Sequence, residues 1–237
     1  MVAYLYRPSV AGRALNDYDR SLLYPMITRS DNNAADTMDQ IVGDGGLWGL
    51  AARVGMTSFV PAQPIWGESE ITVSDQTKFF LHIGSYIPPR HRAYALHLLA
   101  SIVPSQRWGI GEVAPRGWHL YFKGGWGSGT GLIDNQVVLL TRGCTRVSIA
   151  VLTMHDASHD YGKETLKVIF RKLLKGLPTG PHSRYRQART RYLYPNSSSS
   201  TRMARGGARS VSSRAICSIA ASNRDSSTGW ITITSRA

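Results

Sequence analysis

Long apolar runs and cysteines are scarce in this 237-residue chain. It has no run of 18 or more apolar residues, and a helix that spans a bilayer needs about 20, so no membrane span is predicted. Residues 1–7 are too few for a secretory signal peptide, and no other targeting signal that would assign a compartment is recognised in the sequence. The two cysteines, Cys144 and Cys217, lie in unlike sequence contexts, which indicates neither a disulfide framework nor a metal site.

Lysine is absent and acidic residues are nearly absent from the C-terminal part. Residues 181–237 hold ten arginines, no lysine and one acid, Asp225, and so contribute +9 to the formal net charge of +13. The other 180 residues share the remaining +4 and are only mildly basic. The positive charge is therefore a property of one segment and not of the whole surface.

Hydrophobic periodicity fades in the same C-terminal segment, where four serines in a row occupy 197–200. We predict one folded domain, residues 1–177, followed by an Arg- and Ser-rich disordered tail, residues 178–237. The tail has no RNA-recognition, zinc-finger or spaced-aromatic pattern, so nucleic acid is not an expected partner. Translation of an altered reading frame is a second interpretation of the tail.

Apolar spacing predicts the elements of the folded part. It favours two short helices over 34–42 and 47–54 and further helices around 79–83 and 94–103. The pattern then changes to strands over 118–123, 132–141 and 146–154, with a turn at 142–145. A closing amphipathic helix over 166–174 ends near Gly176 and Pro178. A helical block, an antiparallel sheet and a covering helix predict an α+β fold.

Two tripeptides stand at meaningful places in this pattern. Ser30-Asp31-Asn32 comes directly before a helix predicted to begin near Asn33, and Lys123-Gly124-Gly125 stands at the end of the first strand. Alone, the first tripeptide reads equally well as a helix N-cap. Together and in this order, they resemble the S-D-N and K-T-G motifs of the serine β-lactamase and penicillin-binding-protein superfamily, whose first motif is S-x-x-K.

The resemblance runs from residue 1 to about 177. It includes the short sequence segments 24–27, 106–110 and 122–126, which are similar to those of class A-type enzymes. It implies a β-lactamase/transpeptidase-like fold with a helical subdomain, an antiparallel sheet and a C-terminal covering helix. It also implies acyl transfer on a small-molecule substrate, a β-lactam or a peptidoglycan-like D-Ala-D-Ala peptide, without metal or cofactor. Family members are usually secreted or held in the cell envelope.

The family's roles carry over to the positions that match its motifs. Ser30 would relay a proton to the leaving nitrogen, and Lys123 would supply positive charge to the substrate carboxylate and to Ser30. Asn32 would bind the substrate's side-chain amide. Gly125 and Trp126 would border the substrate, and the backbone N–H of Trp126 would provide half of an oxyanion hole.

The nucleophile motif is missing. The only serines before Ser30 are Ser9 and Ser21, neither is followed three residues later by lysine, and the first lysine is Lys78. We therefore expect little or no turnover. We also expect a chain truncated at its N-terminus that lacks the family's N-terminal helix and edge strands and leaves a sheet edge unpaired. A noncatalytic remnant or ligand-binding module of the same fold is the alternative function.

Two further departures concern deacylation and substrate choice. The E-x-x-L-N pentapeptide of class A enzymes does not occur, and Glu68 and Glu70 in the corresponding stretch read as solvent-facing loop charges. Gly124 replaces the usual threonine or serine of the third motif, which removes a hydroxyl that would bond the substrate carboxylate. Substrate preference is expected to differ accordingly.

Other candidate sites have weaker support. The glycine-rich run 124–131 precedes a strand and not a helix, which argues against a phosphate loop. A cluster near 155–160 has metal-ligand chemistry, but a solvated loop is the favoured interpretation. Helical histidines are left without a role, and of the tryptophans only Trp126 has motif support. The cluster consists of His155, Asp156, His159 and Asp160. The helical histidines are His82, His91 and His97, and the tryptophans without motif support are Trp48, Trp66, Trp108 and Trp118.

Overall fold

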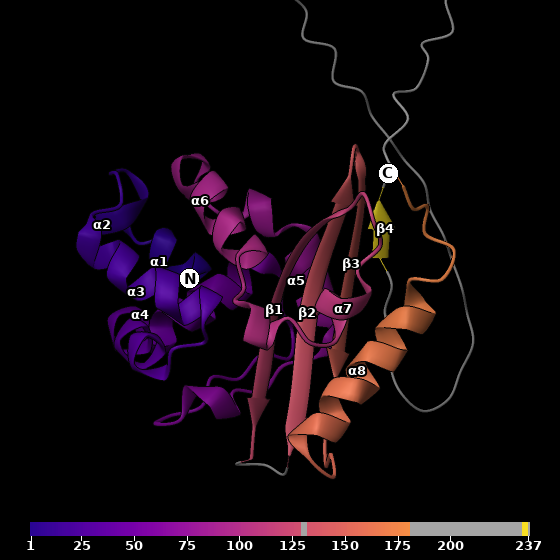
Figure 1. Cartoon of the computed structure of the whole chain (residues 1–237). Coiled ribbons are helices and arrows are strands. Elements are labelled where there is room, and N and C mark those ends of the chain that lie inside the picture. The colour runs from indigo at the N-terminus through magenta and orange to yellow at the C-terminus, as the bar shows by residue number, and fades with distance from the viewer. Residues whose placement is uncertain (129–131, 181–233, 237) are drawn as a thin grey trace, which may run out of the picture.

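The computed structural model describes residues 1–128, 132–180 and 234–236. Helices from the first two-fifths of the chain form a lobe beside an antiparallel sheet, and a long helix crosses the front of the sheet (Figure 1). The α-helices are α1 (Val2–Leu5), α2 (Pro8–Ala11), α3 (Asp17–Thr28), α4 (Asn32–Val54), α5 (Val73–Leu81), α6 (Pro89–Ala100), α7 (Ile110–Val113) and α8 (His159–Leu173). Three 3-10 turns are η1 (Trp66–Glu68), η2 (Ile83–Ser85) and η3 (Pro104–Gln106).

The sheet has the order β1-β2-β3-β4, with antiparallel pairing throughout. Its strands are β1 (His119–Gly127), β2 (Ile133–Arg142), β3 (Thr145–Leu152) and β4 (Thr234–Arg236). The predicted α+β, β-lactamase-like fold is confirmed. The first strand was expected to end at the glycine motif, but β1 continues to Gly127 because Gly124 and Gly125 pair with β2. Ladder pairing outweighs the low strand propensity of glycine there.

Helices cover the sheet on both faces. In Figure 1, α7 and α8 lie in front of the strands and α5 lies behind them, and α6 packs against β1. Leu166 and Phe170 of α8 are fully buried, as are Phe122 and Leu140 of the sheet. The spacing of four between the two α8 residues places both on one helix face, which explains why the pattern predicted this helix.

Helix α4 differs from the prediction of two separate short helices. It is one element over Asn32–Val54, interrupted at Gly43, where φ 61° and ψ 169° are not helical. Glycine adopts positive φ at little cost, so the break falls where the sequence permits it. The sequence pattern also missed α3, which has a capping box between Asn16 and Asp19 at its start.

The sheet edge at β3 was expected to be unpaired, and this expectation is wrong in part. Strand β4 pairs with residues 146–148 of β3, which satisfies backbone groups there. Within the described residues, positions 149–152 of this edge have no strand partner beyond β2. The predicted disordered tail lies outside the described residues except for 178–180 and 234–236.

None of the described helices combines the length and the apolar character that a bilayer-spanning helix needs.

Candidate active site

The serine of the first tripeptide and the lysine of the second meet at the edge strand β1. Lys123 Nζ lies 2.5 Å from Ser30 Oγ and 2.5 Å from the carbonyl oxygen of Gly124. The Ser30 hydroxyl donates to Gln106 Oε1 over 2.9 Å, and Gln106 Nε2 donates to the carbonyl of Arg29 over 2.7 Å. Gln106 therefore orients the Ser30 hydroxyl, a role that the sequence did not indicate although 106–110 belonged to the resemblance.

Ser30 is not the N-cap of the helix that follows it. Asp31 is, and its carboxylate accepts from the backbone N–H of Ala34 over 2.9 Å. The helix begins at Asn32, one residue earlier than predicted. Ser30 itself has φ 54°, a left-handed conformation that residues with a Cβ seldom adopt. The cap interaction thus belongs to Asp31, and the hydroxyl of Ser30 remains available to Lys123 and Gln106.

Burial changes the chemistry of Lys123. It lowers the pKa of the ammonium group to about 8, because the charged form loses hydration inside the protein. Among the described residues, no carboxylate forms an ion pair with it. The amine is therefore partly neutral at slightly alkaline pH and is able to accept a proton as well as donate one.

An indole ring occupies the space beside the atypical glycine of the third motif. A Cβ built on Gly124 would lie 3.1 Å from Cη2 and 3.2 Å from Cζ2 of Trp108. Trp108 is almost fully buried, and its carbonyl accepts from Gln136 Nε2 over 2.9 Å. The departure from K-T-G is therefore coupled to a packing contact: the Trp108 ring would have to shift to accommodate a threonine side chain.

We expect Gly124→Thr to destabilise the protein by about 1–3 kcal/mol, the usual cost of overpacking a filled site. The matched control is Gly125→Thr, since a Cβ there meets nothing within 4 Å. Chemical denaturation of both variants at pH 7 measures the difference. Equal stability of the two variants would show that the Trp108 contact does not exclude a side chain.

Trp126 belongs to an aromatic cluster that ends in a buried acid. Its ring stacks on His159 with centroids 5.7 Å apart, and Trp108 contacts both rings edge-on at 5.9 and 5.5 Å. His159 Nδ1 lies 2.6 Å from Oδ1 of Asp134, which is directly opposite Trp126 in the β1–β2 register. Burial raises the pKa of Asp134, with Asp156 adding to the rise and His159 opposing it. This cluster packs against the end of β1, the strand that carries Lys123.

The segment 155–160 was expected to be a solvated loop, with a metal site as the weaker alternative. His159 and Asp160 instead begin α8, while Asp156 accepts from the Thr153 hydroxyl over 2.5 Å. No group of three or more histidines, cysteines and acids in the described parts of the chain is placed to hold a metal ion. Asp134, which the sequence analysis did not single out, is the acid that His159 contacts.

The remaining predicted site residues are exposed at the surface. Asn32 is exposed on the first turn of α4, Gly125 is exposed, and the Trp126 side chain is 42% exposed. The ring centroid of Trp126 lies 5.9 Å from Lys123 Nζ. Glu68 and Glu70 are exposed and make no ion pair within the described residues, as the sequence analysis expected of loop charges.

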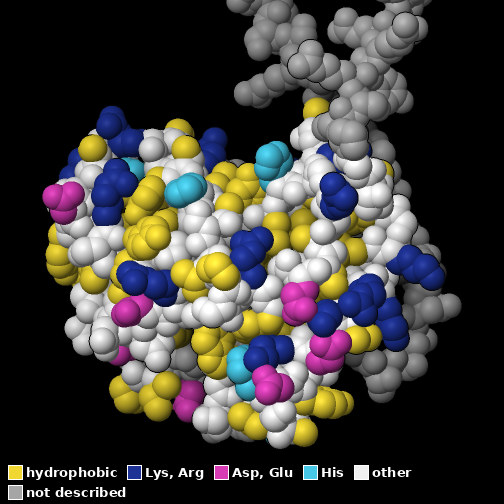
Figure 2. All heavy atoms as spheres, viewed as in Figure 1, with side chains coloured by type: hydrophobic (Ala, Val, Ile, Leu, Met, Phe, Trp, Pro, Cys, Tyr) yellow, Lys and Arg dark blue, Asp and Glu magenta, His cyan; other side chains and the backbone are white. Residues whose placement is uncertain are grey.

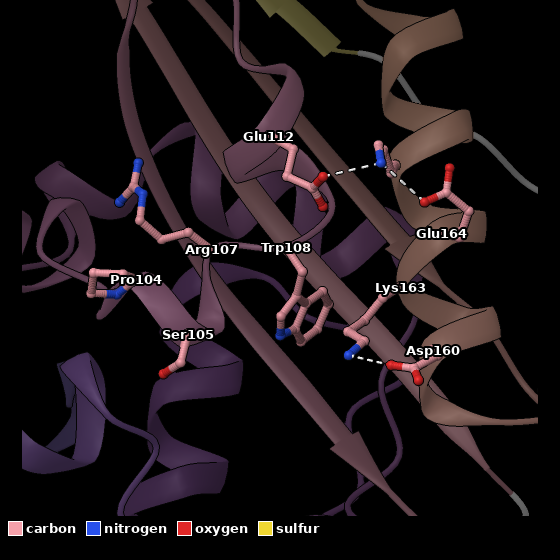
Figure 3. A pocket seen from close by; sticks show the side chains of 9 residues that line it. Pro104, Ser105, Arg107, Trp108, Glu112, Asp160, Lys163 and Glu164 are labelled. Atoms are coloured by element: carbon pink, nitrogen blue, oxygen red, sulfur yellow. Dashed lines mark hydrogen bonds and ion pairs between the residues drawn. The ribbon is translucent and has the colours of Figure 1, made fainter.

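A hollow of about 460 Å³ opens on the α8 side of Trp108 (Figure 3). Its acids are paired with lysines: Lys163 with Asp160 at 2.6 Å, and Lys167 with Glu112 and Glu164 at 3.1 Å. Figure 2 shows the same mixture of positive and negative side chains over α7 and α8 on this face. The hollow is lined by Pro104, Ser105, Arg107, Trp108, Glu112, Asp160, Lys163, Glu164 and Lys167.

The fold and the site combine in one arrangement: a serine directly before a helix contacts a partly buried lysine on the edge strand of an antiparallel sheet. The sequence model of the Beta-lactamase enzyme family matches residues 19–177, and the chain belongs to this family. Among curated protein sequences, none matches the chain significantly.

Solved structures of class A β-lactamases share the fold. An ancestral class A enzyme has a TM-score of 0.56 and 18% identity over 65% of this chain and 64% of its own. The enzyme of Mycobacterium abscessus has a TM-score of 0.60 and 14% identity over 73% of this chain and 79% of its own. A mutant of the chromosome-encoded enzyme of Vibrio parahaemolyticus has a TM-score of 0.58 and 17% identity, covering 73% and 70%. The chain thus spans less than two thirds of the ancestral enzyme.

Proposed function

We propose that the site at Ser30 and Lys123 binds β-lactams or D-Ala-D-Ala-like amides and supports acyl-transfer chemistry with little turnover in this chain. The observation that carries the proposal is the 2.5 Å contact between a partly buried lysine amine and a serine hydroxyl at β1. A buried cation beside a hydroxyl both attracts an anionic substrate group and conducts a proton.

Each residue has a role that follows from its position. The Lys123 ammonium binds the substrate carboxylate, and Ser30 passes a proton to the leaving nitrogen while Gln106 orients its hydroxyl. The backbone N–H of Trp126 lies in an edge strand and donates to the developing oxyanion. Asn32, at the exposed start of α4, binds an amide of the substrate side chain.

Little turnover is expected because, among the described residues, no acid forms a hydrogen bond or ion pair with Ser30 or Lys123 and could activate a hydrolytic water there. Glu68 and Glu70 are both exposed. A noncatalytic ligand-binding module of the same fold is the second candidate. Only covalent labelling separates it from an acyl-transfer enzyme.

We expect Lys123→Ala to weaken binding of benzylpenicillin and of an N-acyl-D-Ala-D-Ala dipeptide at least tenfold, since a hydrogen bond to a charged group contributes about 1.5–3 kcal/mol. It should also abolish any acylation of the chain. Calorimetry measures the affinity, and intact-mass spectrometry after incubation with a fluorescent penicillin measures the adduct.

Lys78→Ala is the matched control, because Lys78 is exposed on α5 and no carboxylate pairs with it in the described residues. This control should bind as the unchanged protein does. Undiminished binding and labelling in Lys123→Ala would show that Lys123 is not part of the binding site. Absence of binding by the unchanged protein would contradict the proposed function.

A further inference from the structure

We propose that Ser30 is itself the residue acylated by a reactive β-lactam in this chain, and that Lys123 is the base that takes its proton. The inference rests on the proposed function, since it needs a β-lactam in the cleft. It assigns Ser30 the role of nucleophile in place of the proton relay described above, and it assigns Lys123, as the neutral amine, the role of the base that carries the proton to the ring nitrogen.

Geometry is the first support. A nucleophile and its base must lie within hydrogen-bond reach, with a third group orienting them. Lys123 Nζ is in direct contact with Ser30 Oγ, and Gln106 contacts the same oxygen from another side. The left-handed φ of 54° at Ser30 is a costly conformation for a residue with a Cβ, and such strain is concentrated at functional sites.

Electrostatics is the second support. Burial holds the pKa of Lys123 near 8, so a neutral amine is available at mildly alkaline pH. No described carboxylate pairs with the amine and keeps it charged. The competing nucleophile in the described chain, Cys144, is exposed in the turn between β2 and β3, at the end of the hairpin opposite the motif.

The step balances without any co-reactant. The Ser30 proton passes to the neutral amine of Lys123 as Oγ forms a bond to the lactam carbonyl carbon and the carbonyl π electrons move to oxygen. When the carbonyl re-forms, the ring C–N bond breaks, and the Lys123 ammonium returns the proton to the ring nitrogen. The product is an ester on Ser30 that carries the opened ring.

The ester is expected to persist. No acid contacts Ser30 or Lys123 among the described residues, so no group is in place to activate a water for its hydrolysis. The predicted outcome is one adduct for each chain and no further turnover.

The test is incubation of the full chain with a fluorescent penicillin from pH 6 to 9.5, followed by intact-mass measurement and fragmentation of the modified peptide. We expect one adduct on Ser30, with a rate that rises with pH and has a midpoint near 8. Ser30→Ala should lower the rate at least 100-fold. Ser105→Ala, which removes a nearby exposed hydroxyl, and Cys144→Ser should label as the unchanged chain does.

Calorimetry with the same penicillin separates this inference from the proposed function and shows whether Ser30→Ala keeps its fold and its cleft. An adduct on another residue, or an adduct that survives in Ser30→Ala, would overturn the inference. Binding without an adduct at any pH would also overturn it but leave the proposed function standing. Neither binding nor an adduct would reject both.

Discussion

Asp19→Ala is expected to lower the free energy of unfolding by about 1–3 kcal/mol, because it leaves buried hydrogen-bond donors such as the Tyr4 hydroxyl without their acceptor. Asp19 is fully buried at the start of α3 and joins three segments. Its carboxylate accepts from the Tyr4 hydroxyl at 2.5 Å, from Arg13 at 2.5 and 2.9 Å, and from the Asn16 backbone N–H at 2.7 Å. The substitution leaves these donors without their acceptor and loosens α1 and α2 from α3.

The same carboxylate makes stability depend on pH. The Arg13 hydrogen bond, with smaller contributions from Tyr4 and Asn16, holds the pKa of Asp19 well below its ordinary range. A carboxyl with a depressed folded-state pKa stabilises the fold fully above its unfolded pKa of about 3.9, and this contribution is lost as pH falls toward the folded value. Urea unfolding of the unchanged chain and of Asp19→Ala at pH 7 and below pH 4 should show the difference narrowing in acid.

Asp17→Ala is the matched control for this prediction. Asp17 lies two residues earlier in the same helix turn and is exposed, so its loss removes only the interaction with the helix dipole, worth about 0.3–1 kcal/mol. A similar loss of stability in the Asp17 and Asp19 variants would show that the buried cluster contributes nothing beyond helix-terminal charge.

Gly109→Ala is the second substitution with a large expected effect. Gly109 has φ 62° and ψ −114°, and a Cβ there would lie 2.4 Å from Oε1 of Gln136. The buried Gln136 amide bonds both neighbours of Gly109, accepting from the Ile110 N–H and donating to the Trp108 carbonyl, each at 2.9 Å. We expect a loss of about 2–5 kcal/mol from positive-φ strain and overpacking together.

The control for Gly109→Ala is Gly49→Ala in α4, where a Cβ meets nothing within 4 Å. Because alanine favours helices over glycine, this control should gain up to about 1 kcal/mol. Denaturant midpoints measure both effects, and near-ultraviolet circular dichroism reports the expected movement of Trp108. An unchanged midpoint and spectrum in Gly109→Ala would show that this turn tolerates a side chain and does not position the indole.

Local pattern was sufficient for much of the fold because burial imposes a period on each element. Helix α8 was predicted from apolar positions such as Leu166 and Phe170, and the hairpin of β2 and β3 from apolar, β-branched runs. Pattern was insufficient for α3, whose Pro25 argues against a helix interior, and for the part of β1 beyond Lys123, where glycines argue against a strand. Tertiary packing outweighs propensity at both places.

Two short motifs at fixed places in a predictable pattern of helices and strands were enough to indicate the family resemblance and the α+β class, and the resemblance implied that Lys123 acts on Ser30. Three side-chain contacts became visible only in the folded chain: Gln106 bonds Ser30, Trp108 lies beside Gly124, and Asp134 contacts His159, which stacks on Trp126. These contacts join residues 16 to 76 positions apart through side-chain packing. Such packing leaves no periodic trace in the chain, so no reading of local pattern could supply it.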